Sequence, residues 1–117
     1  MRKENRLARE AAFREVLDKG RRRESPELKI SILEGCCGPP FLGIVVGRKL
    51  GAATKRNRFK RRVREAVRKH PGFAEGVRVV VVAKPGALRL TYAEINALIE
   101  AAFGRTGEEV GKSGENG

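Results

Sequence analysis

The stretch from Thr54 to Lys69, T-K-R-N-R-F-K-R-R-V-R-E-A-V-R-K, is the segment around which the rest of the chain is organised. Its apolar residues recur at the spacing of one face of an α-helix: Phe59, Val63, Ala66 and Val67. Thr54 is the expected N-cap, and Pro71-Gly72 ends the segment where a helix cannot easily continue. The pattern predicts an amphipathic helix whose apolar face lies on a core.

The other faces of this helix are almost entirely cationic. Nine of residues 54–69 are Lys or Arg, and Glu65 is the only acid among them. A helix face that only contacts water usually mixes both signs of charge, because oppositely charged residues four positions apart stabilise it. A solvated surface helix is one interpretation. The near absence of acids favours a helix that binds a polyanion.

Length and composition limit the class of protein. With 117 residues and 40% hydrophobic residues, the chain is expected to form a single domain with one modest core. The net charge of +12 favours a nucleic-acid partner, or less often an anionic membrane surface. No apolar run is long enough to span a membrane or resembles a signal peptide, so we expect a cytoplasmic protein with no membrane partner.

The N-terminal region combines a basic segment with a predicted helix. Residues 1–8 are basic and show no period, so an extended arm is expected there. Residues 9–19 have the spacing of a helix that ends at Gly20, with an apolar face formed by Ala12, Phe13, Val16 and Leu17. On spacing alone, Phe13 is a core residue. Residues 21–23 form a second basic cluster.

Three strands are predicted from the hydrophobic pattern. Residues 27–33 alternate, which places Lys29 and Ser31 on the face opposite the apolar side chains, where they meet water or a ligand. Residues 41–46 are continuously apolar, as in a more deeply buried strand, and residues 77–83 form the most β-branched run. The basic helix therefore lies between two strands.

Two short segments carry weak signals. Gly47-Arg48-Lys49-Leu50-Gly51 precedes the basic helix and is able to hold a phosphate through backbone N–H groups, but it lacks the P-loop pattern. Cys36 and Cys37 are adjacent, too few for a zinc site and too close for an unstrained disulfide. We interpret them as free thiols in a loop.

The C-terminal region contains a third helix and a tail. Thr91 and Glu94 form a capping box, and the helix that they open ends at Gly104. Residues 105–117 are rich in Gly and Glu, so a disordered tail is predicted. The order α-β-β-α-β-α predicts an α+β domain over residues 1–104, with helices packed on one sheet.

The residues suggest a binding protein and not a catalyst. His70 is the only histidine, and its place at the end of the basic helix is that of a boundary residue. The acids are scattered, and nothing resembles the carboxylate cluster that two-metal phosphodiester cleavage requires. No catalytic residue or metal ligand is therefore assigned, and a free-standing protein nuclease is disfavoured.

The chain resembles a known family in its central segment. Residues 42–51, L-G-I-V-V-G-R-K-L-G, followed by residues 53–61 and Val63-Arg64-Glu65, resemble the signature of the bacterial ribonuclease P protein subunit, whose hallmark is Arg56-Asn57-Arg58. The resemblance covers about residues 6–103. It includes Arg6-Leu7, Phe13, Val16, Gly20, residues 79–85 and Leu90-Thr91-Tyr92.

The resemblance implies a fold and an activity. The fold is that of the second domain of ribosomal protein S5, with about four strands, three helices and a left-handed strand–helix–strand crossover, where general rules predict a right-handed one. The subunit binds a catalytic RNA, and together they remove the 5′ leader of precursor tRNA by Mg²⁺-dependent hydrolysis. The chemistry and the metal ions belong mainly to the RNA, and no protein partner is required.

The resemblance also implies two binding surfaces. The catalytic RNA is expected to contact Arg48, Lys49, Arg56, Asn57, Arg58, Lys60, Arg61 and Arg64. The leader is expected in a cleft between the first helix and the sheet, lined by Phe13, Leu17, Lys29 and Ser31. Phe13 then stacks on bases instead of filling the core.

Three positions depart from many relatives. The chain has Leu17 or Ser31 where relatives often have an aromatic residue, and Gly47 where they have serine. Leader affinity is therefore expected to depend more on charge. The alternative function is that of a structural or ribosomal RNA-binding protein without a processing role.

Overall fold

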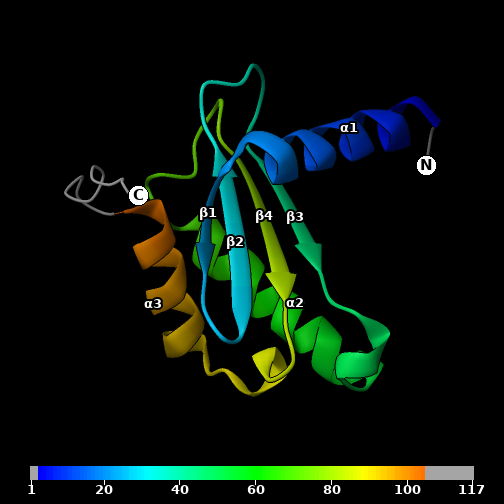
Figure 1. The fold of residues 1–117 in the computed structure, drawn as a ribbon, viewed down its shortest axis with the longest axis vertical. Coiled ribbons are helices and arrows are strands. Elements are labelled where there is room, and N and C mark those ends of the chain that lie inside the picture. Colours follow the sequence, from blue (N-terminus) through cyan, green and yellow to red (C-terminus); the bar gives the residue numbers. More distant parts are fainter. Residues whose placement is uncertain (1–2, 105–117) are drawn as a thin grey trace.

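The computed structural model describes residues 3–104 as three helices packed on one four-stranded sheet (Figure 1). The elements follow one another as α1 (Lys3–Lys19), β1 (Arg21–Glu24), β2 (Leu28–Leu33), β3 (Phe41–Val45), the 3₁₀ turn η1 (Arg48–Leu50), α2 (Ala53–Arg68), β4 (Arg78–Ala83), the 3₁₀ turn η2 (Ala87–Arg89) and α3 (Tyr92–Phe103). The predicted α+β class and the order of its elements are confirmed. The fourth strand is β1, which has the sequence of the second basic cluster.

The sheet is mixed, with strand order β1-β2-β4-β3. β2 is antiparallel to both neighbours, and its full length pairs with β4 from Leu28↔Ala83 to Leu33↔Arg78. β3 and β4 are parallel, and α2 connects them. Figure 1 shows α2 behind the sheet. The chain leaves β3 at the sheet edge, passes through α2 and enters β4, which lies between β3 and β2. This connection is left-handed, as the family resemblance implies.

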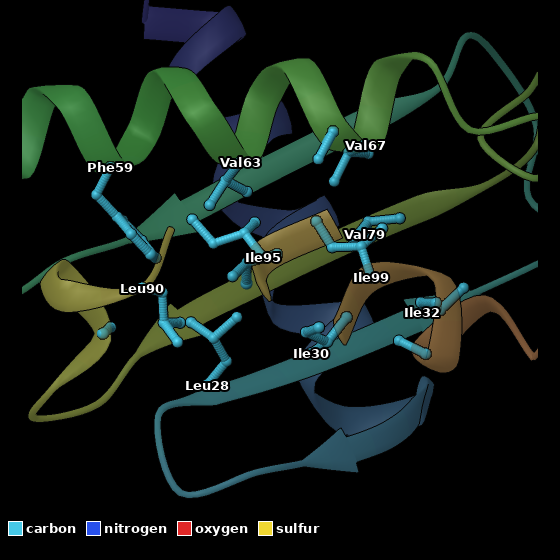
Figure 2. Packing of buried hydrophobic residues seen from close by; sticks show 14 residues of the cluster. Leu28, Ile30, Ile32, Phe59, Val63, Val67, Val79, Leu90, Ile95 and Ile99 are labelled. Carbon is cyan, nitrogen blue, oxygen red and sulfur yellow. The ribbon is translucent and has the colours of Figure 1, made fainter. Parts of the chain in front are cut away.

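The main core lies between the sheet and the helices α2 and α3. The alternation in β2 turns Leu28, Ile30 and Ile32 toward these two helices (Figure 2). The apolar stripe of α2 meets them there, and all four of its members are at most 2% exposed: Phe59, Val63, Ala66 and Val67. The predicted amphipathic helix is therefore confirmed.

α1 lies on the opposite face of the sheet, where Val16 is fully buried. This helix begins at Lys3, so the expectation of an extended arm was wrong from that residue onward. Residues 3–9 have the sequence K-E-N-R-L-A-R, and most of these residues favour a helix. They continue, toward the N-terminus, the helix that is held on the sheet by the buried Val16. α1 ends before Gly20, where a Cβ would lie 2.6 Å from the Val16 carbonyl oxygen.

The helix ends agree with the sequence pattern in one case and differ in another. α3 has the predicted capping box between Thr91 and Glu94, and it ends at Gly104 in the left-handed conformation. The N-cap of α2 is Ala52, which has no side-chain cap, so the assignment of Thr54 as N-cap was wrong. The helical turn already begins two residues earlier, because the Arg56 N–H bonds to the Ala52 carbonyl.

The remaining segments are loops and the chain ends. Cys36 and Cys37 are free thiols in the loop between β2 and β3. The predicted tail of residues 105–117 lies outside the described residues. Among the helices of residues 3–104, none combines the length and the apolar character needed to cross a membrane.

Candidate nucleic-acid interface

The solvent side of α2 carries most of the residues expected to bind RNA. Asn57, Arg58, Arg61 and Arg64 are exposed, and Arg56 and Lys60 are half-buried. Four ion pairs occur among the side chains that the structure describes, those of residues 9–104: Lys19–Glu15, Arg21–Glu34, Arg78–Glu15 and Lys84–Glu24. None of these four uses a cation of α2. Its positive charge is therefore available to an external polyanion.

The first turn of α2 concentrates this charge. Its first turn contains no acid, although a helix N-terminus itself carries a partial positive charge. Arg48 and Lys49 of η1 are exposed just before it. Cations placed at the positive end of a helix dipole repel it in the free protein, so a bound anion relieves that repulsion as well as pairing with the side chains.

Arg62 of α2 and Lys69, which follows it, make contacts toward α3. Arg62 is half-buried and donates a hydrogen bond of 3.1 Å from Nη1 to the Leu90 carbonyl, which joins α2 to the segment before α3. Just beyond α2, Lys69 has its Nζ 5.0 Å from the centre of the Tyr92 ring. Interaction with the Tyr92 side chain, by hydrogen bonding and then by charge, raises the pKa of Lys69. Both residues therefore face α3 and the segment before it.

Phe13 lies on the opposite face of the sheet, against β3. Its ring is half-buried and packs edge-on against Phe41, with ring centres 6.5 Å apart. A Cβ at Gly43 would lie 2.5 Å from Phe13 Cε2, so the ring rests on the backbone of β3 where only glycine leaves room. The position combines packing on β3 with partial exposure, and stacking of Phe13 on bases stays a prediction.

The other expected leader residues differ in their accessibility. Leu17 and Lys29 are half-buried, but Ser31 is only 2% exposed. Period-two alternation does place Ser31 on the same face as Lys29, and α1 packs against this strand, but Ser31 is buried where Lys29 is only half-buried. Ser31 is therefore buried and does not line an open cleft in this structure.

The sequence pattern did not predict the partly exposed apolar residues Val45 and Val82, which lie beside Lys29 in the sheet. Lys29 pairs with Val82, which in turn pairs with Val45. Val45 is 38% exposed, the only large apolar side chain among the described residues to be so exposed. Both valines lie in continuously apolar runs, in which no alternation marks the uncovered face. Val45 and Val82 together form an apolar strip on the face of the sheet where Phe13 packs against Gly43.

An ion pair borders this strip. Lys84 Nζ lies 2.7 Å from Glu24 Oε2 and also donates to the Ser25 carbonyl at 2.8 Å. The hydrogen bond from Lys84, followed by its charge, lowers the pKa of Glu24. Glu24 therefore keeps its negative charge to a lower pH. In the register of β1 and β2, it lies opposite Lys29.

The family of the chain follows from comparison with known proteins. The family model described as Ribonuclease P matches residues 1–107. The chain belongs to the ribonuclease P protein family. The family resemblance drawn from Arg56-Asn57-Arg58 and the residues around it is therefore confirmed.

Relatives of the ribonuclease P protein family match nearly the whole chain. The ribonuclease P protein component of Symbiobacterium thermophilum is 38% identical over 109 residues, which cover 92% of this chain and 95% of the relative. That of Bacillus cereus is 30% identical, with the same coverage of both chains. The match therefore extends well beyond the central signature.

Solved structures of the ribonuclease P protein family share the fold. The protein from Thermotoga maritima in complex with 1-(4-fluorophenyl)-2-thiourea superimposes with a TM-score of 0.68 at 26% identity, over 82% of this chain and 94% of that one. The Staphylococcus aureus protein gives a TM-score of 0.62 at 28% identity, over 78% and 84% of the two chains. The mixed four-stranded sheet with three helices is the fold of this family.

The site residues of this ribonuclease P protein fall on two surfaces. The exposed side of α2 with η1 carries the residues expected to contact catalytic RNA, while Phe13, Leu17 and Lys29 lie on the face covered by α1. Among the side chains that the structure describes, those of residues 9–104, no group of three or more His, Cys, Asp or Glu is placed to hold a metal ion.

Proposed function

We propose that this chain binds two RNA molecules, one on each face of its sheet, as the protein subunit of ribonuclease P. Ribonuclease P is a ribonucleoprotein endonuclease of tRNA processing, and membership in the family assigns the chain to it. The observation that carries the two-surface proposal is the unpaired cationic side of α2, held by a fully buried apolar stripe on the face away from Phe13.

The catalytic RNA occupies the α2 surface. The residues proposed to contact it are Arg48, Lys49, Arg56, Asn57, Arg58, Lys60, Arg61 and Arg64. Arginine guanidinium groups suit phosphate because they form two parallel hydrogen bonds. If about six phosphates are contacted, the logarithm of the affinity falls against the logarithm of the salt concentration with a slope of roughly −4 to −5.

The 5′ leader of precursor tRNA follows the α1 face. Bases stack on the exposed part of Phe13 and contact Leu17, while Lys29 neutralises a phosphate. The apolar strip of Val45 and Val82 continues this path beyond α1, and Ser31 is left out because it is buried. Stacking on an aromatic ring tolerates any base, which suits leaders of varied sequence.

Hydrolysis of the phosphodiester is assigned to the RNA subunit. Mg²⁺ is proposed to be held mainly by the RNA and the substrate, as the resemblance to the family implies. The protein lowers the repulsion between the two RNA molecules and holds the leader, which raises the affinity for the precursor over the mature tRNA.

The deciding experiment is cleavage of a precursor tRNA by the catalytic RNA at low Mg²⁺, with and without this protein. We expect the protein to stimulate cleavage, because its cations replace part of the Mg²⁺ that screens the RNA. RNA binding without stimulation would indicate a structural RNA-binding protein. Cleavage by the protein in the absence of RNA would indicate a protein nuclease.

A further inference from the structure

A groove of about 500 Å³ lies along the edge of the sheet, between β3 and α2. Four cations line it: Arg9, Lys60, Arg64 and Arg68. Its apolar lining comes from Leu42 and Ile44 of β3, from Pro39 and Pro40, and from Phe73. None of the described side chains that line the groove is acidic.

The cations lie on two sides of the groove. Lys60, Arg64 and Arg68 are spaced four residues apart, so they follow one another along α2 at intervals of about 6 Å. Arg9 comes from α1, whose N-terminal half reaches past β3 beyond the sheet edge (Figure 1). The groove is thus enclosed between cations of two helices on opposite faces of the sheet.

The apolar side chains form the floor. Leu42 and Ile44 are half-buried on the side of β3 that faces α2, and Phe73 is half-buried beside them. The volume lies within the range of cavities that hold a drug-sized molecule, roughly 300–1,000 Å³. One nucleotide is of that size and combines a flat apolar ring with negative charge at its edge.

We propose that this groove binds one unstacked nucleotide from a single-stranded segment of the catalytic RNA. The base lies against Phe73 and the apolar floor, and the flanking phosphates pair with Arg9 on one side and with Arg64 and Arg68 on the other. Proteins recognise single-stranded RNA in this way, by stacking splayed bases on aromatic side chains and pairing the backbone with cations. The inference rests on the proposed function, since Lys60 and Arg64 already belong to the α2 surface.

The shape of the site favours RNA over other anionic partners. A flat bilayer surface does not reach the floor of a concave groove, so it leaves Leu42, Ile44 and Phe73 unused. The carboxylates of an acidic peptide would pair with the cations, but such a peptide has no planar ring beside each charge to lie against Phe73. A nucleotide uses both parts of the lining.

The test compares three variants with a matched control in binding to the catalytic RNA. Arg9→Gln and Arg68→Gln each remove one exposed charge, and Phe73→Leu keeps apolar packing but removes the aromatic face. Arg23→Gln removes an exposed charge on β1, away from the groove. We expect each groove arginine variant to reduce the magnitude of the salt slope by about 0.7–0.9, and Phe73→Leu to weaken binding about tenfold. Arg23→Gln should match the wild type, and circular dichroism confirms that all variants are folded.

A photo-crosslinking arm identifies the occupant. Benzoylphenylalanine placed at the exposed position of Pro40 should crosslink to the catalytic RNA in the assembled complex. Unchanged affinity and salt slope in all three groove variants, or crosslinking to the precursor leader or to protein instead, would overturn the proposal. If the wild type also failed to bind the catalytic RNA, the proposed function itself would be wrong, whereas wild-type stimulation with silent groove variants would reject the groove alone.

Discussion

The Nε–H of Arg56 donates a hydrogen bond to the carbonyl oxygen of Gly51, at 3.1 Å. The first arginine of Arg56-Asn57-Arg58 is therefore tied to the turn that joins η1 to α2, and it is half-buried. Arg58 is exposed. The two arginines of one motif thus occupy different positions, one bracing the turn that carries Arg48 and Lys49, the other pointing to solvent.

Replacing these arginines by lysine should separate the two positions. Arg56→Lys keeps the charge but loses the planar guanidinium that bonds Gly51, so we expect roughly fivefold weaker binding of the catalytic RNA, equivalent to about 1 kcal/mol. Arg58→Lys should change affinity by less than about twofold, because a phosphate contact survives as a charge contact. A salt titration of RNA affinity checks both variants. Equal effects of the two substitutions would contradict the assignment of a turn-bracing role to Arg56.

Phe13→Ala should weaken binding of precursor tRNA but not of mature tRNA. Loss of base stacking costs about 1–3 kcal/mol, and only the precursor has a leader to stack. The measurement is the affinity of the assembled enzyme for both substrates, taken before cleavage proceeds. Phe13→Leu retains packing on β3 and serves as control for loss of fold. An equal decrease for mature tRNA would place Phe13 outside the leader path.

Gly43→Ala should produce the same leader defect while Phe13 itself is unchanged. The added Cβ would lie 2.5 Å from Phe13 Cε2, so the ring has to move off the backbone of β3. Gly47→Ala is the matched control, because a Cβ there meets nothing within 4 Å. Leader affinity and thermal unfolding are measured for both variants. Wild-type leader affinity in a folded Gly43→Ala variant would show that the position of the ring is unimportant.

Thr91→Ala should lower the free energy of unfolding by about 1 kcal/mol, because it removes the side-chain oxygen that caps α3. Thr54→Ala should have almost no effect, since Thr54 lies inside α2 and Ala52 is the N-cap. Urea unfolding followed by circular dichroism compares the two. A larger loss for Thr54→Ala would restore Thr54 as the residue that begins α2.

Glu24→Gln should reduce the dependence of the free energy of unfolding on pH in the acidic range. Lys84 lowers the pKa of Glu24 below 4.5 in the folded protein, so the ion pair stabilises the fold above that pH and is lost as the pH falls through the lowered pKa. The variant should be slightly less stable near neutral pH and its stability should fall less steeply with acid. Unfolding midpoints across this pH range test the expectation, and parallel curves for the two proteins would contradict it.

The core could be predicted from sequence because its signals are periodic. The stripe of α2 and the alternation in β2 each define one face, and burying both faces brings Phe59 and Val63 onto Leu28 and Ile30. The capping box of α3 is equally local, since Thr91 and Glu94 are three residues apart.

The missed features depend on contacts distant in sequence. β1 consists of four exposed residues, and only its backbone pairing with β2 makes Arg21–Glu24 a strand. The burial of Ser31 is set by where α1 crosses the sheet, which the alternation in β2 does not specify. The groove beside the edge strand β3 is likewise lined by Arg9 and Phe73, which are far apart in the sequence.

The continuous pairing of the sheet from β1 to β3 has a mechanical consequence. Phe13 rests on one side of this sheet and the stripe of α2 is packed on the other, so the two layers cannot slide independently without breaking the backbone ladder. The domain therefore acts as a spacer of fixed thickness between whatever binds its two faces. Spin labels on α1 and α2 should report one narrow distance distribution, whether RNA is bound or not.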